Sequence, residues 1–401
     1  MSIFSKLNDS WYKKSHLHLL SEAKDTYASN ILPRFIKAIV VPHAALSYSG
    51  LCAASSYAST LDNDLNPNRN IKRVIILGTW HNCTIPEVCD KLIIPDISES
   101  SVKIHNGNIN LDIDTYTNLL KNTNIVIDND NTHFSKEHSI EIQMPFIKYC
   151  YPLAKVIPIL IGKRDSYEDV IETISNLDNE NTLWIMSGDF YHINGRFNFK
   201  VKSSEVKKYN ANAVNLFLEP TADTSKKMLT YYNNYVPTIC GWSVFRLWSE
   251  LPISHKLHGN ISCYYTSVYN EINYPRIFTD EYESSVSYLS VIYYPKTIKL
   301  QKVFTNYDLL NIDIAINKLI NEFNNNNIPK NEMIDYYGEH SPRFIKMFME
   351  NILFKSFNFS SYTNNNLLIE QKLKEEIGVQ PEISTTLLGL IAFGIGTIIF
   401  I

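Results

Sequence analysis

Histidine and aspartate residues follow three short apolar segments of the sequence. His43, His81 and the pair Asp189 and His192 each come shortly after such a segment. The segments are residues 39–41, 73–78 and 182–186. If they are parallel β-strands, their carboxyl ends meet at one edge of a sheet, where open α/β sheets bind ligands. Imidazole and carboxylate groups bind metal ions or transfer protons, so the pattern predicts a metal or acid/base site at this edge.

The elements that must position these residues indicate an α/β fold. Parallel strands need crossover connections, which are usually helices. Helical patterns are expected at residues 19–29, 111–121 and 169–177. Further runs of strand type occur at residues 91–95, 155–162, 261–268 and 286–294. We therefore predict a central, mostly parallel or mixed sheet flanked by helices.

The segment from residue 137 to residue 146 is expected to form a helix, because its apolar residues recur at helical spacing. Glu137 and Glu141 would then share one face, with His138 beside them. Two interpretations stay open. The carboxylates are either solvated groups at the start of the helix, where its dipole favours them, or groups that point at the predicted site.

Five motifs resemble those of the Memo family in order and approximate spacing. They are Val41-Pro42-His43-Ala44, Leu77-Gly78-Thr79-Trp80-His81, Glu137-His138-Ser139-Ile140-Glu141, Ser187-Gly188-Asp189-Phe190-Tyr191-His192 and Thr238-Ile239-Cys240-Gly241. The similarity extends from about residue 10 to residue 288. It implies a dioxygenase-like fold, similar to that of the class III extradiol enzymes that use non-haem iron.

The resemblance implies a metal site of two histidines and one cysteine, which fall on His43, His81 and Cys240. The family's metals are iron or copper, and zinc also suits this ligand set. Cys240 lies at the expected start of a helix through residues 244–248, where its thiolate would be stabilised. Three protein ligands leave a coordination position open for water, oxygen or substrate.

The resemblance also assigns roles to neighbouring residues. Asp189 and His192 line the same pocket and are our candidate catalytic acid/base groups. His138 and Glu141 are candidates for groups that fix the tautomer of a liganding histidine.

Several neighbours of the ligands depart from the family pattern. The departures are Ala45, Trp80, Asn82, Gly188 and the pair Trp242-Ser243. Because the ligands themselves are retained, metal binding is expected to persist. Where family members use these neighbouring positions to contact a substrate or a peptide, the resemblance does not predict the same contacts for this chain.

Composition narrows the class of protein. The chain has 401 residues and a formal net charge of −4, so no basic face for nucleic acid is expected. Six cysteines without paired spacing, in a chain whose first residues lack a signal-peptide pattern, favour reduced thiols in the cytosol. Cys83 is then interpreted as an ordinary core residue although it lies near His81.

The C-terminal part of the sequence predicts membrane attachment. Residues 383–401 carry no charge and would span roughly 28 Å as a helix, close to the hydrocarbon thickness of about 30 Å. We predict a Memo-like domain over residues 1–296, a helical extension over residues 297–382 and a single transmembrane tail anchor. The main domain would face the cytosol.

Two classes of function follow. In the first, the chain is a membrane-tethered enzyme with a non-haem iron or copper centre and redox activity. In the second, it is a non-catalytic signalling or adaptor module whose pocket holds a metal ion, a peptide or a small molecule.

Overall fold

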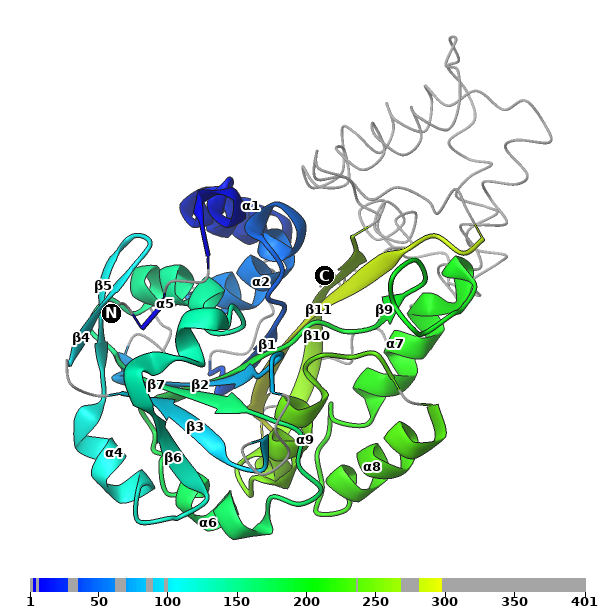
Figure 1. Ribbon diagram of the computed structural model, residues 1–401. Helices are drawn as coiled ribbons and strands as arrows, with labels where there is room; N and C mark the ends of the chain where they lie inside the picture. Colours follow the sequence, from blue (N-terminus) through cyan, green and yellow to red (C-terminus); the bar gives the residue numbers. More distant parts are fainter. Residues whose placement is uncertain are drawn as a thin grey trace, which may run out of the picture.

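The computed structural model describes residues 3–4, 7–27, 35–61, 70–83, 89–96, 100–235, 237–267 and 281–297. A mixed sheet of 11 strands lies between two layers of helices (Figure 1). The predicted α/β class, with a mixed and mostly parallel sheet flanked by helices, is therefore confirmed.

The main sheet has the strand order β10-β11-β1-β8-β2-β7-β3-β6. Strands β1, β8, β2 and β7 are parallel to their neighbours in this central run, whereas β11 pairs antiparallel with both β1 and β10. The bounds are β1 Ala38–Val41, β2 Arg73–Thr79, β3 Leu92–Pro95, β4 Ser101–Ile104, β5 Gly107–Leu111, β6 Ile125–Asp128, β7 Lys155–Ile161, β8 Thr182–Ser187, β9 His192–Ile193, β10 Leu257–Thr266 and β11 Ser285–Pro295.

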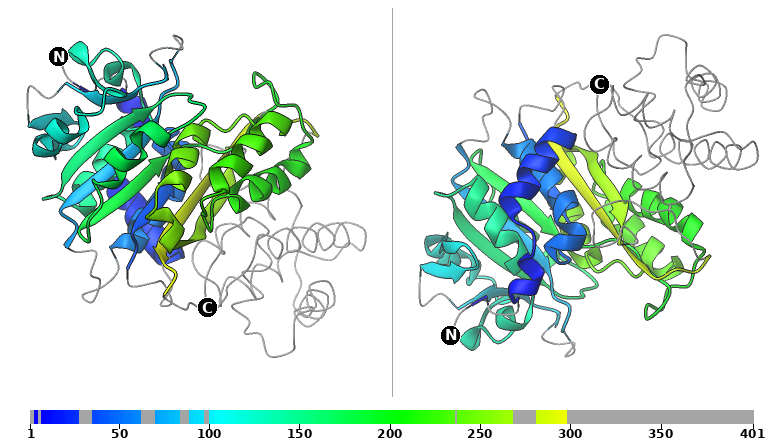
Figure 2. Two further views of the ribbon diagram at one scale, coloured as in Figure 1. Left: turned by 90° about the horizontal axis from the view of Figure 1, so that it is seen from below. Right: turned by 90° about the horizontal axis from the view of Figure 1, so that it is seen from above.

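Helices cover both faces of the sheet (Figure 2). One layer contains α1, α2 and α5, and the other contains α4, α6, α7, α8 and α9. The bounds are α1 His16–Tyr27, α2 Leu46–Thr60, α4 Ile113–Leu119, α5 Met144–Cys150, α6 Glu168–Ser175, α7 Val206–Asn215, α8 Thr224–Tyr235 and α9 Trp242–Glu250.

Strand β1 is apolar at every position, and both of its faces are buried. In β1, Ile39 and Val41 pack in the core under α2, whereas Ala38 and Val40 pack in the opposite core under α9. All four residues are fully buried. Two-sided burial explains why the sequence shows a continuous apolar run here and no alternation.

The segment after Glu137 differs from the predicted helix. Glu137 itself is extended, residues Glu141–Gln143 form a 3-10 helix, and α5 begins only at Met144. The reason is local: the Glu137 carboxylate accepts hydrogen bonds from the backbone N–H groups of His138 and Ser139. Such bonds compete with helix formation, so the prediction that Glu137 and Glu141 share a helix face was wrong.

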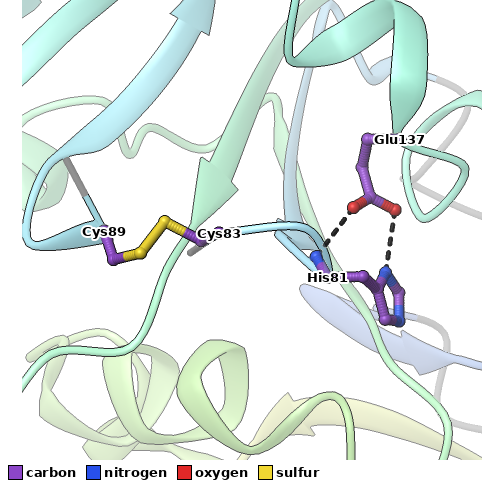
Figure 3. Close-up of a disulfide and its surroundings, with 4 residues drawn as sticks. All are labelled: His81, Cys83, Cys89 and Glu137. Carbon is purple, nitrogen blue, oxygen red and sulfur yellow. Dashed lines mark hydrogen bonds and ion pairs between the residues drawn. A yellow bond between two sulfur atoms is a disulfide. The ribbon is translucent and has the colours of Figure 1, made fainter. Parts of the chain in front are cut away.

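The expectation that all cysteines are reduced was also wrong. Cys83 and Cys89 form a disulfide (Figure 3). The other four cysteines, Cys52, Cys150, Cys240 and Cys263, are free thiols. Five residues separate the two partners in the sequence, and their Cα atoms lie 5.6 Å apart. The bridge begins two residues after His81, at a cysteine that we had expected to be only a core thiol.

The predicted C-terminal features lie outside the described residues, which end at residue 297. This holds for the tail anchor at residues 383–401 and for all but the first residue of the extension. Among the helices that the structure describes, none is both long and apolar enough to cross a membrane. The domain boundaries stay predictions.

Candidate metal centre

The carboxyl ends of two parallel strands and the segment before α9 bring the predicted ligands together. His43 lies two residues beyond β1, His81 two residues beyond β2, and Cys240 just before the start of α9. Their ligand atoms all lie within 4.8 Å of one another. The distances suit a single shared ion, so these three residues form a candidate metal-binding triad, as the resemblance implied.

The tautomer of His43 follows from its hydrogen bonds. The Ser187 hydroxyl donates its only proton to the carbonyl oxygen of Ser139 over 2.6 Å, so it can only accept at the Nδ1 atom of His43, 3.3 Å away. Nδ1 of His43 therefore carries the proton and Nε2 has a free lone pair. Nε2 lies 3.1 Å from Sγ of Cys240, which is the side where a shared ion would bind.

A chain of buried polar groups holds this arrangement. Gln143 donates to the Ser187 hydroxyl over 3.3 Å and to the carbonyl oxygen of Pro42 over 2.8 Å. Tyr57, on α2, donates in turn to Gln143 over 3.1 Å. Sequence reasoning missed all three side chains, because serine, glutamine and tyrosine are common in cores and their shared network exists only after folding.

Glu137 orients the second histidine. Its carboxylate accepts both the backbone N–H of His81, over 2.8 Å, and the Nδ1 proton of the same residue, over 2.9 Å (Figure 3). These bonds leave Nε2 of His81 available to a metal ion. Burial raises the pKa of Glu137, but its contacts with His81, His138 and the Ser139 amide outweigh that effect and bring the pKa to about 2. The group is therefore a buried anion at neutral pH.

His138 lies beside the imidazoles of the two candidate ligands, His43 and His81. Its ring stacks on that of His81 with centroids 4.5 Å apart and meets the ring of His43 edge-on at 5.1 Å. Glu141, the other candidate supporting residue, is buried and accepts the backbone N–H of Leu7 over 3.3 Å. In the structure, Glu137 is thus the carboxylate that contacts a candidate ligand. The predicted role of Glu141, to fix the tautomer of such a histidine, stays a prediction.

Cys240 reaches the site because the backbone after β8 and the backbone before α9 approach each other closely. A side chain at Gly188 would collide with the backbone of Gly241, so the turn after β8 and the turn before α9 require glycine. The backbone N–H of Asp189 donates to Sγ of Cys240 over 3.2 Å. Burial raises the pKa of the Cys240 thiol despite its place near a helix N-terminus. A bound cation is thus needed to displace the thiol proton.

Asp189 and His192 also lie beside Cys240. Their ligand atoms also lie within 4.8 Å of Sγ of Cys240. Asp189 is buried and accepts the backbone N–H of His43 over 2.8 Å, which fixes the start of the His43 loop. Among the described residues, the buried Nε2 atom of His192 has no hydrogen-bond partner. A ligand bound beside Cys240 would supply that partner.

Comparison with known sequences agrees with this geometry. The sequence profile of the Memo-like protein family matches residues 6–292, which is more than half of the chain. The chain belongs to the Memo-like protein family. Its relatives include a MEMO1 family protein of Thermoplasma volcanium, which is 26% identical over 257 residues. That match covers 63% of this chain and 84% of the relative.

Two eukaryotic Memo relatives are similar at comparable levels. The protein memo-1 homolog of Caenorhabditis elegans is 24% identical over 302 residues, covering 70% of this chain and 79% of the relative. The MEMO1 family protein MHO1 of Saccharomyces cerevisiae is 29% identical over 179 residues, covering 40% of this chain and 49% of the relative. The chain thus spans about half the length of the yeast protein and most of the length of the other two.

The residues of this Memo chain fit a borderline-soft metal ion. Two imidazole nitrogens and one sulfur suit iron, copper or zinc better than magnesium or calcium. The Nδ1 atom of His43 contacts the Ser187 hydroxyl, and the Nδ1 atom of His81 contacts the Glu137 carboxylate. Metal-binding histidines commonly have such a partner at the nitrogen that does not bind the metal. The unpartnered nitrogen of His192 beside the triad is a further sign that a ligand belongs there.

Ser187→Ala is expected to weaken metal binding by roughly 10- to 100-fold, the range for lost groups that orient a ligand. The substitution removes the acceptor that fixes the proton on Nδ1 of His43. Titration with Co²⁺, whose absorption reports ligand geometry, measures the effect. Ser59→Ala, at a buried serine of α2 that bonds its own helix, is the matched control. Equal affinities in both variants would contradict the assigned tautomer.

The metal-free protein is expected to lose stability in mild acid. Burial, followed by the neighbouring His43 and His81, lowers the pKa of His138 to about 3, whereas an unfolded histidine titrates near 6.5. Below pH 6.5 the unfolded chain therefore binds a proton that the folded chain excludes. This group alone should reduce the free energy of unfolding by about 2 kcal/mol between pH 7 and pH 5. Urea unfolding of the parent and of His138→Gln measures it, and identical pH slopes would refute it.

Proposed function

We propose that this Memo-family protein binds iron or copper through His43, His81 and Cys240 and uses the ion for redox chemistry. The supporting observation is the mutual distance of at most 4.8 Å among the three ligand atoms, which come from distant parts of the chain. A bound iron or copper ion would supply Lewis-acid and electron-transfer chemistry. The exposed side of the site is at His81, so substrate would approach there.

His192 is the proposed acid/base group. Burial lowers its pKa, so the imidazole is neutral at pH 7 and able to take a proton. Its unpartnered Nε2 atom is the atom that would receive the proton from a ligand. Asp189 holds the backbone of His43 and lies next to His192, where its negative charge favours the protonated imidazole.

Metal analysis combined with oxygen uptake tests this function. The full chain is loaded with Fe²⁺ or Cu²⁺, and bound metal and oxygen consumption with ascorbate are measured. We expect His192→Gln to keep the metal content of the parent and to lose most of its oxygen uptake. A parent protein that binds no metal would refute the proposal. A parent that binds metal but consumes no oxygen with any reductant would favour the non-catalytic module.

Membrane attachment is a separate proposal, supported by the uncharged apolar sequence of residues 383–401. The tail would hold the Memo domain at a membrane surface on its cytosolic side. Fractionation of cells that express the full chain or a chain ending at residue 382 tests it. Equal amounts of both proteins in the membrane fraction would contradict the proposal.

A further inference from the structure

The disulfide lies directly beside a ligand of the candidate metal centre. Cys83 follows His81 by two residues, in the turn that carries this imidazole away from β2 (Figure 3). His81 is also the exposed member of the triad. The position of its ring therefore depends on how firmly the turn is attached to the rest of the domain.

The other half of the disulfide is anchored to the sheet. Cys89 is buried and packs against Gly162, the residue after β7, so closely that no side chain fits at that glycine. Leu92, the first residue of β3, follows three residues later. Cys89 is thus part of the rigid framework, and the bridge fastens Cys83 to it covalently.

Other described contacts also hold the turn: Cys83 packs against the core, and several hydrogen bonds are formed. Asn82 donates to the carbonyl oxygen of Lys136 over 3.3 Å, and Glu137 accepts the two N–H groups of His81. Before the turn, the backbone N–H of Trp80 donates to the carbonyl oxygen of Ile161. Among the residues that the structure describes, the disulfide is the one covalent cross-link between the carboxyl side of the His81 turn and the segment that packs on β7 and leads into β3.

We propose that the Cys83–Cys89 disulfide is a site of thiol exchange whose reduction weakens metal binding at His81. The inference rests on the proposed metal-binding function and adds redox control to it. Cys83 is half-buried whereas Cys89 is buried, so Cys83 is the sulfur open to attack. The partner class is a dithiol reductant.

Reduction of the bridge proceeds by thiol–disulfide exchange in two steps. A thiolate of the dithiol attacks Sγ of Cys83, the Cys83–Cys89 bond breaks, and Cys89 leaves as a thiolate that takes a proton from water. The second thiol of the reductant then attacks the mixed disulfide and releases Cys83 as a thiol. The protein gains two electrons and two protons, and the dithiol becomes a disulfide.

Affinity for Co²⁺ in the full chain tests the coupling. Protein is compared in the oxidised state, after reduction and anaerobic removal of the reductant, and as Cys83→Ser/Cys89→Ser. We expect the reduced parent and the double variant to bind Co²⁺ about tenfold more weakly than the oxidised parent, at the lower end of the range for groups that support a ligand. Cys150→Ser is the matched control and should keep the parent's dependence on reduction, because Cys150 is a free thiol of α5.

A second measurement does not depend on metal. Amide hydrogen exchange at His81 should accelerate on reduction and in the double variant, because the amide bonded to Glu137 lies in the turn that the disulfide fastens. Equal affinity and equal exchange in the oxidised and reduced states, with both thiols confirmed by mass spectrometry, would overturn the proposal. Tighter binding after reduction would overturn it as well. If the oxidised parent binds no Co²⁺ but its amide hydrogen exchange responds to reduction, the proposed metal binding is refuted. The disulfide would then still be shown to hold the His81 turn in place.

Discussion

Cys240→Ser is expected to lower the affinity for Fe²⁺ or Co²⁺ by roughly 100- to 1000-fold. Structural metal sites with four ligands have binding free energies of about 10–16 kcal/mol, so one ligand accounts for roughly 3 kcal/mol. A serine hydroxyl is a harder and far more weakly acidic group than a thiol and would not replace the sulfur as an anionic ligand. In the structure Sγ of Cys240 lies 3.1 Å from Nε2 of His43, so the substitution removes a sulfur atom directly beside another candidate ligand atom.

Two controls make this result specific. Cys150→Ser changes a free cysteine on α5, and this variant should bind metal like the parent. Among the described residues, Cys150 belongs to no group of His, Cys, Asp and Glu side chains close enough to share a metal ion. Loss of the sulfur-to-cobalt charge-transfer absorption in Cys240→Ser alone would show that this sulfur is the ligand. Retention of full affinity and of that absorption in Cys240→Ser would exclude the triad as the metal site.

Replacement of Glu137 is expected to affect both metal binding and stability. In Glu137→Gln an acceptor oxygen becomes an NH₂ group and the negative charge is lost, so the proton on Nδ1 of His81 is no longer fixed. Metal affinity should fall by roughly 10- to 100-fold. Glu137→Ala also leaves three backbone N–H groups without their acceptor, and it should cost about 3–5 kcal/mol of unfolding free energy.

Glu141→Gln is the matched control, because Glu141 is a second buried glutamate in the same segment. The sequence suggested that Glu141 fixes the tautomer of a ligand, but in the structure Glu137 bonds the Nδ1 atom of His81, so we expect Glu141→Gln to change metal affinity much less. Co²⁺ titration and urea unfolding of the three variants separate the two contributions. If Glu141→Gln weakened binding as much as Glu137→Gln, the carboxylate that orients the site would have been misassigned.

The response of Glu137 to pH has a definite sign. Its pKa is lowered to about 2 in the folded protein, and an unfolded glutamate titrates near 4.3. Its stabilising effect is therefore fully present above pH 4.3 and is lost as the pH falls towards 2. At neutral pH the anion is always present to orient His81.

Sequence reasoning located the candidate site residues because their surroundings are regular. His43, His81 and Asp189 each lie two residues beyond a central strand, and such strands are readily recognised as apolar runs. The family resemblance supplied Cys240, whose own surroundings are not distinctive. The same reasoning failed at Glu137. Apolar residues recur at helical spacing in this segment, but the Glu137 carboxylate accepts hydrogen bonds from the backbone N–H groups of His138 and Ser139, and these bonds compete with the helix.

The sequence by itself determined the α/β class and the family, and it indicated which side chains could serve as metal ligands. These features depend on strand-length apolar runs and on motifs contiguous along the chain, so short-range patterns suffice to reveal them. Only the tertiary structure decided that Glu137 orients His81, that Ser187 and Gln143 set the tautomer of His43, and that Cys83 pairs with Cys89. Hydrogen bonds and disulfides act over a few ångströms, and only the folded sheet determines which of the many polar side chains come within that distance.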